Sequence, residues 1–147
     1  MTQADGNQIT GQCLCGAVQV SARLGLPHLR ACHCDMCRRH TGSMFMSIQA
    51  EQGSVQATGP VKRFVSSEWA ARCFCETCGS TLWYEIPEAN EINLAAGLFP
   101  DAAGQTLSME FFIDRKPQGY ALTGDHTRLT ADETIALFAP SDEGESQ

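Results

Sequence analysis

The chain reads Cys13-Leu-Cys15, Cys32-His-Cys-Asp-Met-Cys37 and Cys75-Glu-Thr-Cys78 at three places, and these stretches hold seven of its eight cysteines. Thiolates at such short spacing repel one another unless a cation is bound between them. Zinc fits best, because it accepts sulfur ligands in a tetrahedron and has no redox chemistry of its own. We therefore expect a fold organised around two zinc ions.

The first and last of these stretches predict a closed site. Each pair of cysteines, Cys13–Cys15 and Cys75–Cys78, is followed directly by a glycine, Gly16 or Gly79. Two such turns can each present two sulfurs to one ion, while glycine lets the backbone turn tightly beneath it. This site would pin an early strand to a later hairpin and contribute on the order of 10 kcal/mol to folding. The alternative is that these are ordinary buried cysteines.

The middle stretch offers three sulfurs and no obvious fourth. Cys32, Cys34 and Cys37 can converge on a turn that enters a short helix, which leaves one corner of the tetrahedron for water or substrate. Three protein ligands with an exchangeable position are typical of a catalytic zinc site. The alternative is a closed structural site with a histidine as fourth ligand, and the candidates are His28, His33 and His40.

A redox role is a further alternative. Cys34–Cys37 and Cys75–Cys78 each have the spacing of a thioredoxin-type dithiol, but such dithiols lie in a βαβ context that this sequence does not show. Cys73 stands outside the three stretches. We expect it to be a small, half-buried side chain, and the alternative is a supplementary ligand or resolving thiol.

Length and composition predict one globular domain. The chain has 147 residues, of which 43% are hydrophobic, so it can bury a core without help from disulfides. The first residues lack the basic start and apolar run of a signal peptide, and no apolar stretch is long enough to span a bilayer. We expect a soluble cytoplasmic protein with a single domain over residues 1–139 and a disordered acidic tail over residues 140–147.

The charge argues against nucleic acid as a partner. The net charge is −7, and Lys62 and Lys116 are the only lysines, whereas phosphate backbones are held by clustered basic residues. One basic doublet, Arg38-Arg39, directly follows the middle cysteines. It could bind a small anionic ligand, or it could be a solvated pair on a short helix.

Turn residues recur at short intervals, and alternation of apolar and polar residues is commoner than helical periodicity. The pattern predicts a mainly β fold. We expect one strand over Ala17–Leu24, broken by Gly25–Pro27, and further strands over Met44–Ile48, Ser54–Thr58, Val61–Ser66, Thr81–Ile86, Ile92–Ala96 and Leu107–Ile113. Two helices are expected, over Asp35–Thr41 and Thr130–Phe138, the second with a capping box between Thr130 and Glu133.

The order of the three cysteine motifs resembles the glutathione-dependent formaldehyde-activating (GFA) family, which also includes centromere protein V. The motifs that carry the resemblance are Cys13–Gly16, Cys32–Ser43 and Phe74–Ser80, and it extends over roughly residues 9–124, including Phe111–Pro117. The family often has a histidine near the start of the late strand, where this chain has Met109-Glu110.

The resemblance implies a zinc-stabilised β-tent fold of small stacked antiparallel sheets. It also implies a carbon–sulfur lyase or synthase that makes or splits S-(hydroxymethyl)glutathione, with a small thiol and a small aldehyde such as formaldehyde as substrates. The implied zinc ligands are Cys13, Cys15, Cys75 and Cys78 for a structural ion, and Cys32, Cys34 and Cys37 for a second ion with an open position.

The residues around the second site suit this chemistry. A thiol that coordinates zinc loses its proton, and the resulting thiolate can attack an aldehyde carbon. His33, His40 and Asp35 are candidates to handle the proton, while Arg38 and Arg39 could hold carboxylates of the ligand. Two other functions fit the same residues: a non-catalytic zinc-binding module for protein interaction, and a different lyase or hydratase. The sequence carries no signal for the oligomeric state.

Overall fold

The computed structural model describes residues 7–138 and is mainly β, as the sequence predicts. The chain forms two units, which are described here one at a time. The first contains Met1–Leu29 and Met46–Thr106, and the second contains Arg30–Phe45 and Leu107–Gln147. No helix among the described residues is long and apolar enough to cross a membrane.

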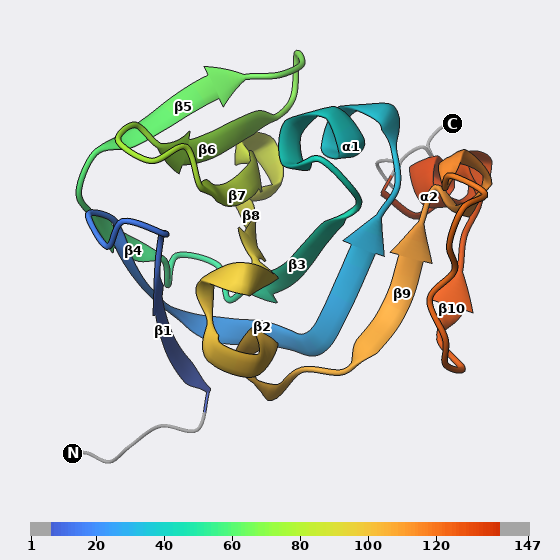
Figure 1. Cartoon of the computed structure of the whole chain (residues 1–147), viewed down its shortest axis with the longest axis horizontal. Coiled ribbons are helices and arrows are strands. Elements are labelled where there is room, and N and C mark those ends of the chain that lie inside the picture. The colour runs from blue at the N-terminus through green and yellow to red at the C-terminus, as the bar shows by residue number, and fades with distance from the viewer. Residues whose placement is uncertain (1–6, 139–147) are drawn as a thin grey trace. The chain divides into compact units, whose positions relative to one another are not determined.

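The first unit is built from antiparallel strands. Its sheet has the order β2-β3-β8-β7-β6-β5, with β1 and β4 both paired to β2, and the hairpins of β5, β6 and β7 lie side by side in Figure 1. The strands are β1 (Gln8–Gln12), β2 (Gln19–Cys32), β3 (Phe45–Ala50), β4 (Gln56–Thr58), β5 (Val61–Val65), β6 (Ala71–Cys75), β7 (Thr81–Ile86) and β8 (Glu91–Ala95). A short 3-10 turn, η1 (Pro87–Ala89), connects β7 to β8, and two more, η2 (Ala96–Leu98) and η3 (Pro100–Gly104), come after β8.

The core of the first unit gathers the inward-facing residues of these strands. Ile48, Leu82 and Leu94 are fully buried, and each contributes about 1.5–3 kcal/mol by leaving water. Cys13 and Cys75 belong to the same buried cluster. The outer cysteine pairs are therefore anchored in the core.

The expected break at Gly25–Pro27 is wrong, because β2 runs on through these residues to Cys32. Gly25 lies against the backbone of Ala50, and a Cβ atom added at Gly25 would be 2.9 Å from the Ala50 carbonyl oxygen. The glycine thus permits a close approach of two backbones within the strand rather than ending it. This longer β2 leads from the first unit into the second and ends on the first cysteine of the middle stretch.

The second unit contains the end of β2, two helices and two late strands. Helix α1 spans Asp35–Thr41 and ends at Gly42, whose φ of 91° is the left-handed conformation that glycine favours at a helix end. Strand β9 (Leu107–Phe111) lies between β2 and β10 (Thr127–Arg128) and runs parallel to β10. The turn η4 (Ile113–Arg115) follows β9, and α2 (Ala131–Phe138) is the last described element.

Both expected helices are confirmed, and so is the capping box of the second. The N–H of Thr130 donates to Glu133 Oε1 at 2.8 Å, and the N–H of Glu133 donates to Thr130 Oγ1 at 3.2 Å. These bonds satisfy two backbone donors that a helix start would otherwise leave unpaired. The expected acidic tail, residues 140–147, lies outside the described residues, and the single domain over residues 1–139 stays a prediction.

Candidate metal centres

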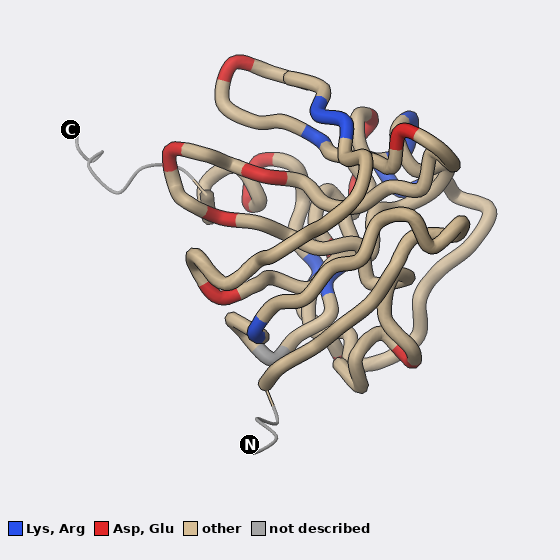
Figure 2. The backbone as a smooth tube through the Cα atoms, turned by 90° about the vertical axis from the view of Figure 1, so that its left-hand side faces the viewer, with Lys and Arg blue, Asp and Glu red and all other residues tan. Residues whose placement is uncertain are grey.

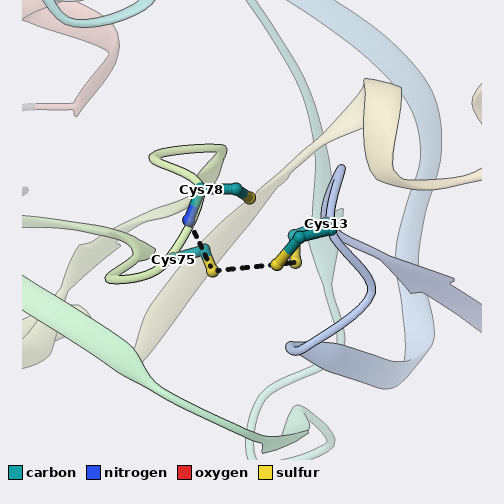
Figure 3. A group of neighbouring side chains, drawn as sticks. Cys13, Cys75 and Cys78 are labelled. Atoms are coloured by element: carbon teal, nitrogen blue, oxygen red, sulfur yellow. Dashed lines mark hydrogen bonds between the residues drawn. The ribbon is translucent and has the colours of Figure 1, made fainter.

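Four cysteines of the first unit converge on one point. The Sγ atoms of Cys13, Cys15, Cys75 and Cys78 all lie within 4.8 Å of one another. The first two belong to the turn after β1, Cys75 ends β6, and Cys78 lies in the turn from β6 to β7. Figure 3 shows Cys75 and Cys78 facing the Cys13 turn. The structure thus brings together the four residues that the sequence assigns to a closed metal site.

Backbone N–H groups point at these sulfurs. The N–H of Val18 donates to Cys13 Sγ at 3.3 Å, and the N–H of Cys78 donates to Cys75 Sγ at 3.4 Å. Gly16 and Gly79 have φ angles of 82° and 80°, which are strained for residues with a side chain. The two glycines therefore allow the tight turns whose N–H groups stabilise thiolate ligands.

The four thiols do not ionise alike without a cation. The hydroxyl and backbone N–H of Ser80 are the main groups that lower the pKa of Cys78, to about 5. The N–H of Ala17 acts in the same direction on Cys15, but burial and the neighbouring cysteines outweigh it and raise the pKa of Cys15 to about 11. A divalent cation that prefers sulfur removes this conflict, so the donor set fits such an ion.

Three cysteines of the second unit form another group. The Sγ atoms of Cys32, Cys34 and Cys37 lie within 4.8 Å of one another, with Cys32 at the end of β2 and Cys34 as the N-cap of α1. The N–H of Cys37 donates to Cys34 Sγ at 3.4 Å. The thiols of Cys34 and Cys37, together with burial, raise the pKa of Cys32. Bringing all three to the thiolate state therefore requires a cation, and the group offers one three ligands.

The histidines of the second unit do not join these three sulfurs. His33 is fully buried, and its Nε2 atom lies 2.7 Å from Glu110 Oε1 rather than among the thiols. His40 is in the last turn of α1, and its nitrogens are not part of the sulfur group either. His28 belongs to the first unit. Within the second unit the described donor set is thus three cysteines.

The two arginines of the basic doublet, Arg38 and Arg39, have different surroundings. Arg38 donates to Asp35 Oδ1 at 2.5 Å and to the carbonyl oxygen of His33 at 3.0 Å, and Asp35 also lies 3.4 Å from Arg115 Nη1. Arg38 is thus engaged within its own helix start, whereas Arg39 is exposed. Figure 2 shows acidic positions recurring along the backbone, and in the full sequence 17 acidic residues outnumber 10 basic ones.

Sequence reasoning missed a buried carboxylate near the end of strand β9. Glu110 on β9 is 1% exposed and accepts hydrogen bonds from His33 and His126, while Arg128 Nε lies 3.3 Å from its Oε2. Burial alone would raise the pKa of Glu110, but the hydrogen bonds from His126 and His33 outweigh it and lower the pKa. The available signal was a lone charged residue in the apolar run Leu107–Ile113.

Cys73 takes no part in either sulfur group. It is 1% exposed, which is more buried than the sequence predicts, and its Sγ lies 3.6 Å from Glu85 Oε1. Burial and the charge of Glu85 raise the pKa of Cys73 to about 12. The thiol stays protonated, which suits a packing role.

Comparison with known proteins identifies a family, a homologue and a solved structure of similar fold. The family model described as glutathione-dependent formaldehyde-activating enzyme matches residues 8–115. A Schizosaccharomyces pombe protein named as an uncharacterized lyase is 34% identical over 127 residues, which cover 85% of this chain and 93% of the yeast protein. A Rhodobacter sphaeroides protein of known crystal structure aligns with a TM-score of 0.54 and 19% identity, over 82% of this chain and 99% of that one. The last likeness shows the fold alone.

Proposed function

The chain belongs to the glutathione-dependent formaldehyde-activating (GFA) family, and from this membership we propose that it is a zinc-dependent carbon–sulfur lyase or synthase. Its reaction would join a glutathione-like thiol to a small aldehyde such as formaldehyde, or split the adduct. The name of the yeast relative, a lyase, points in the same direction.

The observation that carries the proposal is the difference between the two sulfur groups. The first unit offers four thiols and can complete a tetrahedron, whereas the second offers three, and neither His33 nor His40 joins them. A tetrahedral ion needs four ligands, so the second group leaves one position for an outside ligand. A small thiol is the ligand that the chemistry of a sulfur site favours.

The metal would supply Lewis acidity that makes an added thiol lose its proton near neutral pH. Cys32, Cys34 and Cys37 would hold the ion. In the addition, the carbon–sulfur bond forms as the sulfur electron pair attacks the aldehyde carbon, and the electron pair of the C=O double bond moves to oxygen, which takes up a proton. Splitting the adduct runs through the same steps in reverse.

Residues beside the three cysteines would handle the rest of the ligand. His33 lies between two of the cysteines in the chain, and Asp35 begins α1, so both stay candidates for proton handling, as does His40. Arg39 is exposed and can meet a carboxylate of the thiol, whereas Arg38 already pairs with Asp35. All eight cysteines are free thiols, which is consistent with a reducing compartment, and we propose the cytoplasm.

Exchange spectroscopy tests the proposal, because formaldehyde and glutathione also combine without a catalyst. We expect the zinc-loaded protein to raise the rate of exchange between free and adduct ¹³C-formaldehyde, measured by two-dimensional NMR at equilibrium. Glutathione should be compared with cysteine and 2-mercaptoethanol, and formaldehyde with acetaldehyde. If no pair of thiol and aldehyde exchanges faster with the protein than in buffer alone, the proposed reaction is contradicted. The alternative function, a non-catalytic zinc-binding module for protein interaction, would then account for the two sulfur groups.

A further inference from the structure

Strand β5 ends the sheet of the first unit with one edge uncovered. It is the last strand of the sheet order, and among residues 7–138 it pairs only with β6. The N–H of Ser66 donates to the Ala70 carbonyl at 3.1 Å, and the N–H of Glu76 donates to the Pro60 carbonyl at 2.8 Å. Because hydrogen bonds alternate along an antiparallel strand, the even-numbered residues of β5 are the ones that bond to β6.

The backbone groups of the odd-numbered residues face outward. Arg63 and Val65 lie between residues that bond to β6, so their N–H and C=O groups point along the uncovered edge. Figure 1 shows β5 at the rim of its sheet, with β6 on its inner side. A row of unpaired backbone groups of this kind is a template for pairing with a further strand.

The β5–β6 hairpin (residues 61–75) also presents apolar side chains to solvent. Phe64, Val65 and Trp69 are each more than half exposed, although the first two stand on opposite faces of β5. Trp69 lies edge-on against Tyr84, with the ring centroids 6.5 Å apart. Large apolar side chains gathered beside an uncovered edge are typical of an interaction surface. The hairpin therefore offers a partner both backbone hydrogen bonds and apolar area.

We propose that β5 pairs with β5 of a second copy of this chain, antiparallel about a two-fold axis at Phe64. In this register Arg63 pairs with the partner's Val65 on each side of the axis, which satisfies the outward backbone groups of both residues. The two Phe64 side chains face each other at the axis. This is a position without backbone hydrogen bonds between the strands, where opposite side chains come closest and an aromatic pair is favourable.

The charges of the hairpin favour a second copy and select this register. Lys62 lies opposite the partner's Ser66, and the partner's Glu68 follows two residues later, within reach of the lysine. An axis at Lys62 or Arg63 would instead place like charges opposite each other. An axis at Val65, the last residue of β5, would pair most of the strand with the loop that follows it. A two-fold pair covers both edges, so association ends at a dimer.

Sedimentation and hydrogen exchange test the pairing in the zinc-loaded protein. We expect the sedimentation coefficient to rise with concentration, from that of one chain to that of two. In the dimer, the amide hydrogens of Arg63 and Val65 should exchange at least about 10-fold more slowly than in the monomer, because they become hydrogen-bonded. The amide hydrogens of Lys62 and Phe64 already bond to β6 and serve as internal controls that should change less. NMR measures both pairs in one experiment.

Phe64→Lys should raise the dissociation constant of the dimer by about 10-fold or more, since it places like charges opposite each other at the axis. Ile135→Lys is the matched control. Ile135 lies on α2 in the second unit and is about as exposed as Phe64, and the substitution adds the same charge. The control should leave the dissociation constant unchanged, and circular dichroism checks that both variants fold.

Two charge reversals distinguish self-pairing from pairing with another protein. Lys62→Glu and Glu68→Lys each bring like charges together in a dimer of identical chains, so each variant alone should dimerise about 10-fold more weakly. In an equimolar mixture each variant supplies the charge that the other lacks. Mixed dimers should therefore form with nearly the dissociation constant of the wild-type protein.

The proposal is overturned if the wild-type protein stays a single chain at every concentration up to about 1 mM, which would leave the edge to a strand of a different protein. A dimer that Phe64→Lys does not weaken would show that another surface makes the contact. Slow exchange of Arg63 and Val65 at every concentration would show that a segment of the same chain covers the edge. None of these measurements uses activity, so the proposed function is tested separately.

Discussion

Replacing Cys75 with serine is expected to unfold most of the protein and to lower bound zinc from two ions per chain to one or none. Cys75 is fully buried in the core of the first unit, and its sulfur belongs to the four-cysteine group. A structural zinc site contributes about 10–16 kcal/mol, which matches or exceeds the whole stability of a typical domain. Circular dichroism during heating and metal analysis by mass spectrometry measure both effects.

Cys73→Ser is the matched control for this change. Cys73 lies on the same strand, two residues before Cys75, and is equally buried, but it contacts Glu85 instead of the other thiols. We expect two zinc ions to remain and the loss of stability to be about 1–2 kcal/mol, since a serine hydroxyl can still donate to the carboxylate. Equal effects of the two substitutions would show that burial, rather than metal binding, makes Cys75 important.

Replacing Cys34 with serine is expected to abolish activity while leaving the first unit folded. Cys34 is one of the three cysteines that we propose as ligands in the second unit, and it caps α1, where serine is also a good N-cap residue. Bound zinc should fall from two ions per chain to one. The exchange rate should fall by about 100-fold or more, which is a larger loss than substitutions of residues that only hydrogen-bond to a metal ligand usually cause. Metal analysis and exchange NMR on the same sample measure these effects.

The Cys34→Ser result separates catalysis from scaffolding. If the second site is structural, the substitution should unfold the chain as Cys75→Ser does. If the variant keeps both the fold and the full exchange rate, the three-cysteine group has no part in the reaction. Cys73→Ser again serves as the control, because it makes the same replacement of sulfur by oxygen at a cysteine that lies outside both sulfur groups.

The sequence predicts the sulfur groups well because ligand spacing is a local property. In Cys32–Cys37 the three thiols are only two and three residues apart, so few backbone conformations can separate them, and α1 begins where the spacing predicts. The capping box at Thr130 and Glu133 is local in the same way. The outer pairs are far apart in the chain, and the prediction that they meet rests on the preference of a zinc ion for four ligands.

The features that the sequence did not reveal depend on contacts between distant residues. Strand β6 does not alternate, because Arg72 is buried within it and places its guanidinium 4.5 Å from the ring centroid of Tyr84. Strand β2 continues through Gly25 instead of breaking there, and the glycine is needed because the Ala50 backbone lies against it, a contact that the local pattern does not contain. Glu110 meets His33 across 77 residues of chain, so only the fold brings this pair together.

Cobalt absorption tests the central claim most directly, namely that an added thiol becomes a ligand of the ion held by Cys32, Cys34 and Cys37. In protein loaded with two Co²⁺ ions, glutathione should increase the sulfur-to-cobalt charge-transfer absorption by the amount expected for about one further thiolate per chain, and Cys34→Ser should abolish the change. S-methylglutathione, whose sulfur has no proton to lose, should have no such effect. A wild-type spectrum that glutathione leaves unchanged would contradict the account.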